Sequence, residues 1–259
     1  MMHGRTHGLV LVTWALVVSL VGGCAWLGLE TADSVMKEGQ QLYLDKKYDE
    51  AIVRFERVIE LDTTRWPAYV YIARCYMAKG AWTLAVTNAR LAYEAQPGGE
   101  EALPTFAEAL LGGGAAAVRT GQFTKAIADF SEYVALHPTD AHGYLGVGQA
   151  YVGAGRYADA AGALARGFQN DRGGALRKEL LKGLLDGGAR ALQQGQAKSA
   201  VGLLQEYIQQ DPRDAAAYVT LGKALLASGN RSDALGAFGQ ALTLNPGQPE
   251  ATDLLRGLR

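Results

Sequence analysis

Two histidines are the first residues whose type could do chemistry, because imidazole is a common metal ligand. His137 and His142 lie five residues apart on either side of a proline, with no cysteine or further histidine beside them. A protein zinc site needs three or four converging ligands. We therefore expect two surface histidines here and no metal site.

Cys75 and two glycine runs are the other candidates. Cys75 stands between Arg74 and Tyr76 with no base or helix start beside it, so we expect a buried, unreactive thiol. Residues 112–114 and 187–188 are glycines, but the Gly-Lys-Ser/Thr end of a phosphate-binding loop does not follow them. The sequence thus predicts close helix packing at these glycines, no cofactor and no enzyme active site.

The N-terminus has the build of a secretory leader. Residues 1–8 carry Arg5 and no acid, residues 9–21 form an apolar run, and Gly22 and Gly23 follow. A positive start, an apolar core and small residues before the cleavage site are the three parts of a signal peptide. We expect residues 1–23 to be removed.

The end of this leader, residues 21–24 with the sequence Val-Gly-Gly-Cys, resembles the lipobox of bacterial lipoproteins. The resemblance implies lipidation of Cys24, with cleavage before it and a short tether over residues 24–31. Ala25 is not the aspartate that retains enterobacterial lipoproteins in the inner membrane, so an outer-membrane anchor facing the periplasm is implied. The alternative is an uncleaved inner-membrane signal anchor, because residues 9–28 are about long enough to span a bilayer.

An internal repeat runs through the rest of the chain. Its marker is Tyr/Phe-x-x-Ala-x-x-x-Phe/Leu, with variations, and the spacings between successive marker alanines are 34, 41, 34, 40 and 34 residues. The alanines are Ala51, Ala85, Ala126, Ala160, Ala200 and Ala234.

A period of 34 residues is that of the tetratricopeptide repeat (TPR), and the chain resembles this family at further positions. With each alanine taken as repeat position 20, position 8 is small in all six copies, and position 24 is bulky in all except the second, which has Ala89. Position 15 is glycine in the last five copies and Lys46 in the first. Proline occupies position 32 in four copies, as Pro97, Pro138, Pro212 and Pro246.

The resemblance implies an all-α fold, a right-handed superhelical solenoid of six helix-turn-helix repeats that bury one continuous core. The uneven spacing groups the repeats into three pairs. The predicted TPR domain covers residues 32–259, with repeats at about 32–65, 66–99, 107–140, 141–174, 181–214 and 215–248 and a capping helix over 249–259.

Extra residues precede the third and fifth repeats. Glu101 and the charged residues 177–179 continue a helical pattern, so we predict about two added turns on the first helix of each of these repeats. Pro104 fits only near the start of such a helix. A loop is the alternative, because Gly98-Gly99 and Gly173-Gly174 would suit one equally well.

The resemblance also implies a concave surface, lined by the first helix of each repeat, that binds partners. Positions 5 and 12 are apolar in all six copies and share a helical stripe with position 9. Such a groove suits an amphipathic helix or an apolar extended segment, and packing within the core is the alternative role for these side chains. The predicted groove residues are Met36, Tyr43, Val70, Arg74, Met77, Leu111, Val118, Arg119, Leu145, Gln149, Val152, Leu185, Leu192, Val219, Lys223 and Leu226.

The predicted layout, a lipid anchor followed by TPR repeats, is similar to that of the TPR pilotins that assist assembly of outer-membrane pilus and secretion machines. An adaptor for envelope enzymes, such as peptidoglycan hydrolases or proteases, and a scaffold for exopolysaccharide export are the alternatives. The net charge of −1 gives no sign of a nucleic-acid partner. In each case we expect envelope proteins as partners, and no small-molecule substrate.

We predict that Cys24→Ala blocks lipidation, because the thiol is the only group in the motif that can carry the diacylglyceryl chain. Metabolic labelling with radioactive palmitate measures this directly, and the variant should lose the label and either leave the membrane fraction or accumulate as the uncleaved precursor. Unchanged incorporation in the variant would exclude lipidation at Cys24 and favour the signal anchor.

Overall fold

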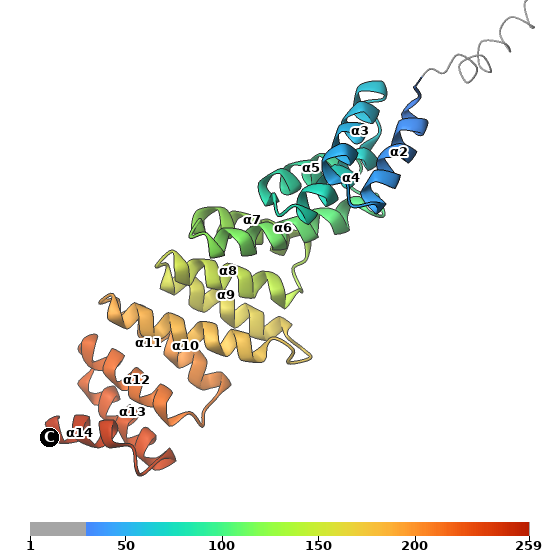
Figure 1. Ribbon diagram of the computed structural model, residues 1–259. Coiled ribbons are helices and arrows are strands. Elements are labelled where there is room, and N and C mark those ends of the chain that lie inside the picture. The colour runs from blue at the N-terminus through green and yellow to red at the C-terminus, as the bar shows by residue number, and fades with distance from the viewer. Residues whose placement is uncertain (1–29, 259) are drawn as a thin grey trace, which may run out of the picture.

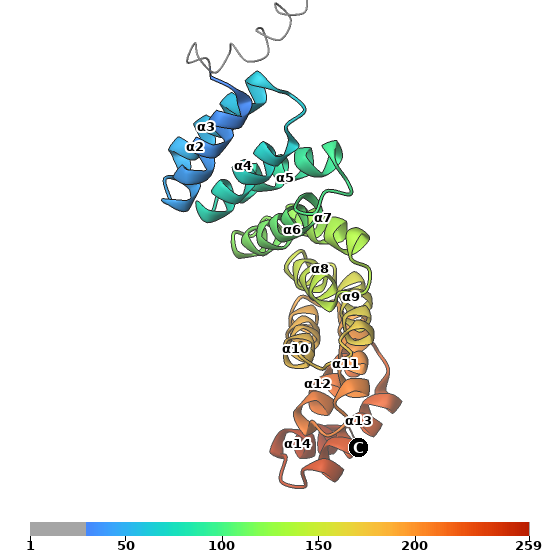
Figure 2. The same cartoon turned by 90° about the vertical axis from the view of Figure 1, so that its right-hand side faces the viewer.

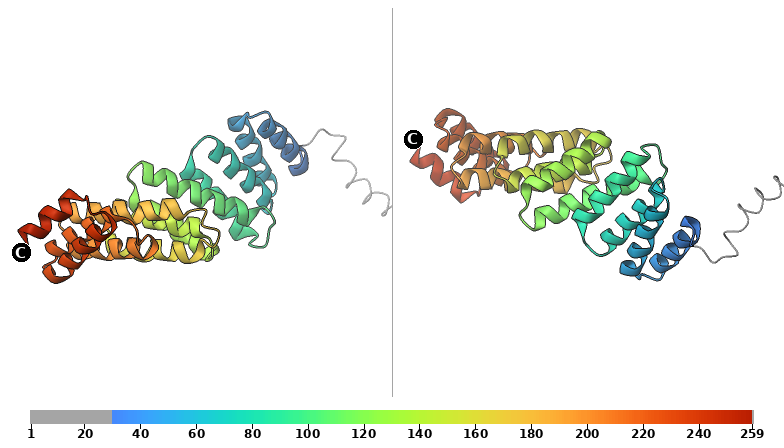
Figure 3. Two further views of the ribbon diagram at one scale, coloured as in Figure 1. Left: turned by 90° about the horizontal axis from the view of Figure 1, so that it is seen from below. Right: turned by 90° about the horizontal axis from the view of Figure 1, so that it is seen from above.

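The computed structural model describes residues 30–258, which fold into thirteen helices joined by short turns. The predicted leader, Cys24 and most of the tether therefore lie outside the described residues. The helices stack into an elongated body, and the two ends of the described chain lie at its opposite ends (Figure 1 and Figure 3). Among residues 30–258 no helix is both long and apolar enough to cross a membrane.

Six consecutive helix pairs correspond to the six predicted repeats, and a last helix follows them, so the predicted all-α TPR solenoid with a C-terminal helix is confirmed. The first helices of repeats one, two, four and six begin at the predicted residues 32, 66, 141 and 215. The helices are α2 (Ala32–Leu44), α3 (Tyr48–Leu61), α4 (Trp66–Ala78), α5 (Trp82–Ala95), α6 (Ala102–Arg119), α7 (Phe123–Leu136), α8 (Ala141–Gly153), α9 (Tyr157–Asn170), α10 (Arg177–Gln193), α11 (Ala197–Gln210), α12 (Ala215–Ala227), α13 (Arg231–Leu244) and α14 (Pro249–Gly257).

The turn inside each repeat needs a left-handed residue at position 15. Gly80, Gly121, Gly155, Gly195 and Gly229 all have φ between 71° and 86°. Lys46 takes the same place in the first repeat with φ 60°, a conformation that L-residues rarely adopt. The glycine pattern seen in the sequence is therefore a backbone requirement of the turn.

The two helices of a repeat cross where a glycine at position 8 faces a bulky side chain at position 24. A Cβ atom on Gly39 would lie 2.7 Å from the Phe55 ring, and one on Gly222 would lie 2.4 Å from the Phe238 ring. Gly114, Gly148 and Gly188 meet Phe130, Leu164 and Leu204 in the same way. The second repeat instead pairs Ala73 with Ala89, both fully buried. In the other five repeats, the glycine at position 8 therefore leaves the space that the bulky side chain at position 24 fills.

The two glycine runs are confirmed as sites of close packing. A Cβ atom on Gly112 would lie 2.0 Å from the Trp82 ring, and one on Gly113 would lie 3.1 Å from Val86, both on α5 of the preceding repeat. In the second run, a Cβ atom on Gly187 would lie 3.0 Å from Val152. These glycines let the helices of neighbouring repeats approach one another.

The added residues before repeats three and five lengthen the first helix by less than predicted. Helix α6 begins five residues, and α10 four residues, before the predicted repeat starts at 107 and 181, which is about one turn rather than two. The remaining residues form turns around the glycine pairs, and Gly174 has φ 70°. Each added turn is packed, since Phe106 is 1% and Leu180 0% exposed. Pro104 lies in the first turn of α6, as predicted.

Two tyrosines fix the junctions within the second and third repeat pairs. Asp140 and Asp214 cap the N-termini of α8 and α12, and each also accepts a hydrogen bond from a tyrosine hydroxyl of the preceding helix, Tyr133 and Tyr207. Burial raises the pKa of both tyrosines, and the adjacent carboxylates raise it further. The phenols therefore remain protonated donors at neutral pH.

The buried apolar residues form one large cluster, which runs through repeats four to six and the last helix, and four smaller ones. Half-buried side chains join four of these clusters, because Tyr76, Leu111 and Tyr151 each pack against two of them. The predicted core therefore continues along the stack, but partly through half-buried contacts. The stack also changes direction around α6 to α9 (Figure 2).

We predict that glycine-to-alanine substitutions change stability in opposite directions at two kinds of site. Gly202 lies in the middle of α11, and a Cβ atom added there would have nothing within 4 Å, so Gly202→Ala should stabilise the fold by up to about 1 kcal/mol through helix propensity. Gly222→Ala should destabilise it by about 1–3 kcal/mol, because the Phe238 ring must move. Urea denaturation followed by circular dichroism measures both. Equal shifts of the midpoint would contradict the close contact at Gly222.

Candidate partner-binding surface

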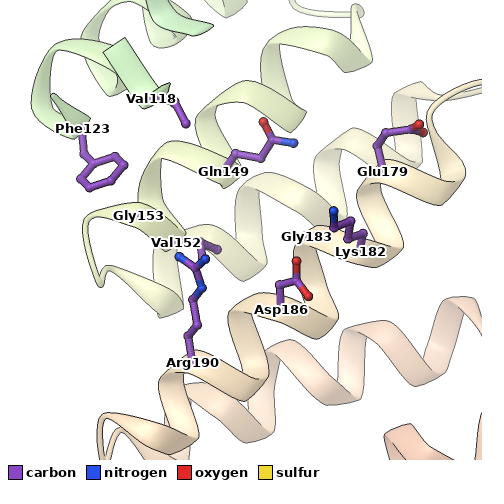
Figure 4. Close-up of a pocket in the computed structure, with 10 residues that line it drawn as sticks. All are labelled: Val118, Phe123, Gln149, Val152, Gly153, Glu179, Lys182, Gly183, Asp186 and Arg190. Atoms are coloured by element: carbon purple, nitrogen blue, oxygen red, sulfur yellow. The ribbon is translucent and has the colours of Figure 1, made fainter. Parts of the chain in front are cut away.

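The first helices of repeats three to five surround a cavity of about 460 Å³ (Figure 4). One wall is α8, with Gln149 and Val152, and the facing wall is α10. Val118 from the end of α6 and Phe123 from the start of α7 close one side. Since these are mainly the first helices of their repeats, the cavity lies on the surface that the sequence assigns to partners.

The apolar end of the cavity depends on a glycine. Val118, Phe123 and Val152 line this end. A Cβ atom on Gly153 would lie 2.2 Å from the Phe123 ring, so only glycine lets the ring lie against α8. The glycine at position 153 therefore allows the aromatic ring of Phe123 to lie at the cavity.

The α10 wall is charged. Glu179, Lys182, Asp186 and Arg190 line it at spacings of three or four residues, which puts them on one face of the helix. All four are exposed, and within residues 30–258 none of them forms an ion pair. In Figure 4 the Arg190 side chain extends toward Val152, and Glu179 lies at the far end of the wall. The charges alternate in sign from one end to the other.

The structure divides the predicted apolar groove residues into two groups. Val70, Leu145, Val152 and Val219 are 9% exposed or less and belong to the core, so the apolar part of the groove is narrower than the sequence indicates. The others are half-buried at the surface of their helices, and their contact with a partner stays a prediction. These are Met36, Tyr43, Met77, Leu111, Val118, Leu185, Leu192 and Leu226.

The predicted polar contacts also differ among themselves. Arg74 lies 3.3 Å from Glu101 and over the ring of Tyr71, and Lys223 pairs with Glu250 of α14. Arg119 and Gln149 are exposed. Arg74 and Lys223 thus form ion pairs within the chain, and among these four predicted polar contacts Gln149 is the one that lines the cavity.

Sequence mapping missed the charged face of α10 and Phe123. The family positions that line the groove are 2, 5, 9, 12 and 13. Lys182 occupies position 2 of its repeat, a position absent from the predicted groove residues, whereas Asp186 and Arg190 are at positions 6 and 10. The detectable signal was the four-residue spacing of charges of alternating sign, on a helix that also carries an added turn. Phe123 gave no separate signal, because it is also the aromatic residue of the repeat marker.

The side chains outside the cavity whose type could do chemistry are held in roles that stabilise the fold. Burial raises the pKa of the Cys75 thiol to about 11, against the pull of nearby Lys79, so the thiol is protonated at neutral pH. Asp140 is partly buried, which opposes ionisation, yet hydrogen bonds from Tyr133 and His142 hold the pKa of its carboxyl below the usual value. Within residues 30–258 no three His, Cys, Asp or Glu side chains converge as a metal site would require.

Comparison with known proteins agrees with this architecture. Two tetratricopeptide-repeat profiles match residues 111–175 and 191–258, together just over half of the chain. No curated protein sequence matches the chain significantly. Among solved structures, Naa15/Naa10 bound to HypK-THB has a TM-score of 0.57 at 13% identity, over 95% of this chain and 36% of that one.

Two smaller TPR structures match over most of their length with lower TM-scores. YrrB, a TPR protein with an unusual peptide-binding site, is 17% identical over 86% of this chain and 90% of its own, with a TM-score of 0.35. Pseudomonas aeruginosa PilF is 15% identical over 87% of this chain and 97% of its own, with a TM-score of 0.38. At such identities the similarity concerns the fold alone.

Helical hairpins stacked in series, with glycine turns and a 34-residue period, define a solenoid of the scaffold class. The chain belongs to the tetratricopeptide-repeat family. Proteins of this family are generally protein-interaction scaffolds without enzymatic activity.

We predict that substitutions on the two sides of the cavity affect stability differently, because Val152 belongs to the core and Arg190 to the surface. Val152→Asp should destabilise the protein by about 2 kcal/mol or more, because it removes the apolar packing of a side chain that is only 8% exposed and desolvates a carboxylate, even with Arg190 nearby. Arg190→Glu should change stability by less than about 0.5 kcal/mol, since the side chain is exposed and unpaired in the described chain. Thermal unfolding of both variants measures the difference, and a stable Val152→Asp protein would contradict the assignment of Val152 to the core.

Proposed function

We propose that this protein is a lipid-anchored scaffold on the periplasmic side of the outer membrane that binds envelope proteins and assists assembly of a pilus or secretion machine. The observation that carries the proposal is the lipobox-like sequence before Cys24, only a few residues ahead of the first repeat. An acylated cysteine would fix one end of a solenoid whose remaining surface is free for partners. The specific machine rests on analogy of layout.

The tether between anchor and scaffold is short. From Cys24 to Thr31 the chain spans at most about 25 Å when fully extended. Its usable length is shorter still, because Glu30 pairs with Arg57 at 3.0 Å and with Arg54 at 3.5 Å, both on α3. The first repeat would therefore stay close to the membrane surface.

A short tether suits a factor that delivers or holds a partner at the membrane. Two acyl chains make membrane attachment stable, whereas one gives only reversible binding. A diacylated anchor would thus keep the partner surface of every repeat within one solenoid length of the outer membrane. A protein that needed only to be retained in the periplasm would gain nothing from this closeness.

The proposal is tested by lengthening the tether. We expect a flexible 30-residue Gly/Ser insertion after Ala25 to impair complementation of a deletion strain while protein abundance, measured by immunoblotting, stays unchanged. A flexible chain of that length has a root-mean-square span of roughly 30 Å, enough to release the first repeat from the surface.

The same insertion placed after Arg259 is the matched control, because it adds equal length without moving the repeats from the membrane. It should complement fully. Complementation by the Ala25 insertion at the level of the unmodified protein would contradict the role of proximity, and loss of function in both insertion variants would show that the linker itself is harmful.

A further inference from the structure

The α10 wall of the cavity carries four exposed charges. Its charges run from Glu179 through Lys182 and Asp186 to Arg190, negative and positive in turn. Neighbours along the wall are three or four residues apart and of opposite sign, so they could pair with one another. They do not, although other charged residues of the described chain form ion pairs at these same spacings, such as Lys125 with Asp129 at 2.5 Å.

Next to the charges lies an apolar recess. Val118, Phe123 and Val152 line the end of the cavity toward which Arg190 extends (Figure 4). A volume of about 460 Å³ accommodates a few side chains and not a whole polypeptide segment. A bound segment would therefore lie over the cavity and insert one large apolar side chain at this end.

The lining favours a helix over an extended segment. The charges of the wall follow one another at intervals of about one helical turn, so a helix laid along α10 presents its own side chains at a matching spacing. A helix satisfies its own backbone groups and presents side chains only. The charged wall runs over twelve residues of α10, from Glu179 to Arg190, a length of about 16 Å that matches three turns of a partner helix.

We propose that this cavity binds an amphipathic helix of a partner protein, whose acidic and basic side chains alternate at three- to four-residue spacing beside one large apolar anchor. An acidic residue next to the anchor pairs with Arg190, and a basic residue one turn away pairs with Asp186. The inference rests on the proposed function as a protein-binding scaffold and specifies the partner's chemistry.

The test is selection of peptides from a randomised 16-residue display library on the full-length protein. Enriched peptides should be helical when bound, carry one large apolar residue, and place an acid and a base one turn apart beside it. A variant with Lys182→Glu, Asp186→Lys and Arg190→Glu should bind these peptides about tenfold more weakly or worse. Peptides with every charge reversed should regain that affinity on the variant.

Lys198→Glu with Arg213→Glu is the matched control, because both residues are exposed and lie outside the cavity lining. This control should bind the selected peptides as the unmodified protein does. Fluorescence anisotropy gives the affinities, and circular dichroism verifies that all variants are folded.

Three results would overturn the inference, and they are distinguishable. Selected peptides that bind the charge-reversed variant equally well, or that require an extended proline-containing sequence, would exclude the helix site and leave the scaffold function standing. Self-association that Arg190→Glu abolishes would show a second copy of this chain to be the occupant. Failure to enrich any peptide would count against the scaffold function itself.

Discussion

The close approach of the two helices in each repeat is the constraint on which the rest of the solenoid depends. Five repeats put glycine at position 8 directly against a phenylalanine or leucine at position 24, at distances that leave no room for a Cβ atom. Glycine within a helix costs about 1 kcal/mol relative to alanine, and the buried aromatic or leucine side chain more than offsets it. The glycine at position 8 and the bulky side chain at position 24 thus fill one volume together, and neither residue can be enlarged unless the other becomes smaller.

The second repeat shows the effect of altering this pair. With alanine on both helices, Ala73 and Ala89 supply less volume, and Phe106 from the added turn of α6 joins their cluster. Its ring stacks on Tyr93 at 5.4 Å and lies under the guanidinium of Arg90 at 4.9 Å. Arg90 in turn holds Glu132 of α7 through both of its terminal nitrogens. The added turn therefore completes the junction between the first and second repeat pairs.

Sequence periodicity predicted the fold because the demands on each repeat are local. A left-handed turn requires Gly121 and its equivalents, and a helix end suits Pro138 and its equivalents, whatever lies beyond the repeat. The length of the added turns was overestimated because Gly98-Gly99 and Gly173-Gly174 ended them early, and the sequence was compatible with either outcome. Val219 and Leu185 are both apolar and occupy the same repeat position, yet the first is buried and the second is not. That difference in burial depends on how neighbouring repeats are oriented relative to one another, and the sequence of one repeat does not determine this orientation.

The division of the core has a mechanical consequence. Elements joined in series share the same tension, and the weakest junction yields first. Repeats four to six share one large apolar cluster, whereas the first three repeats are joined by smaller ones, one between repeats one and two and another between repeats two and three. A pull applied between the two ends would load all of these junctions alike, and the N-terminal junctions, each of which holds fewer buried residues, would open before the distal ones.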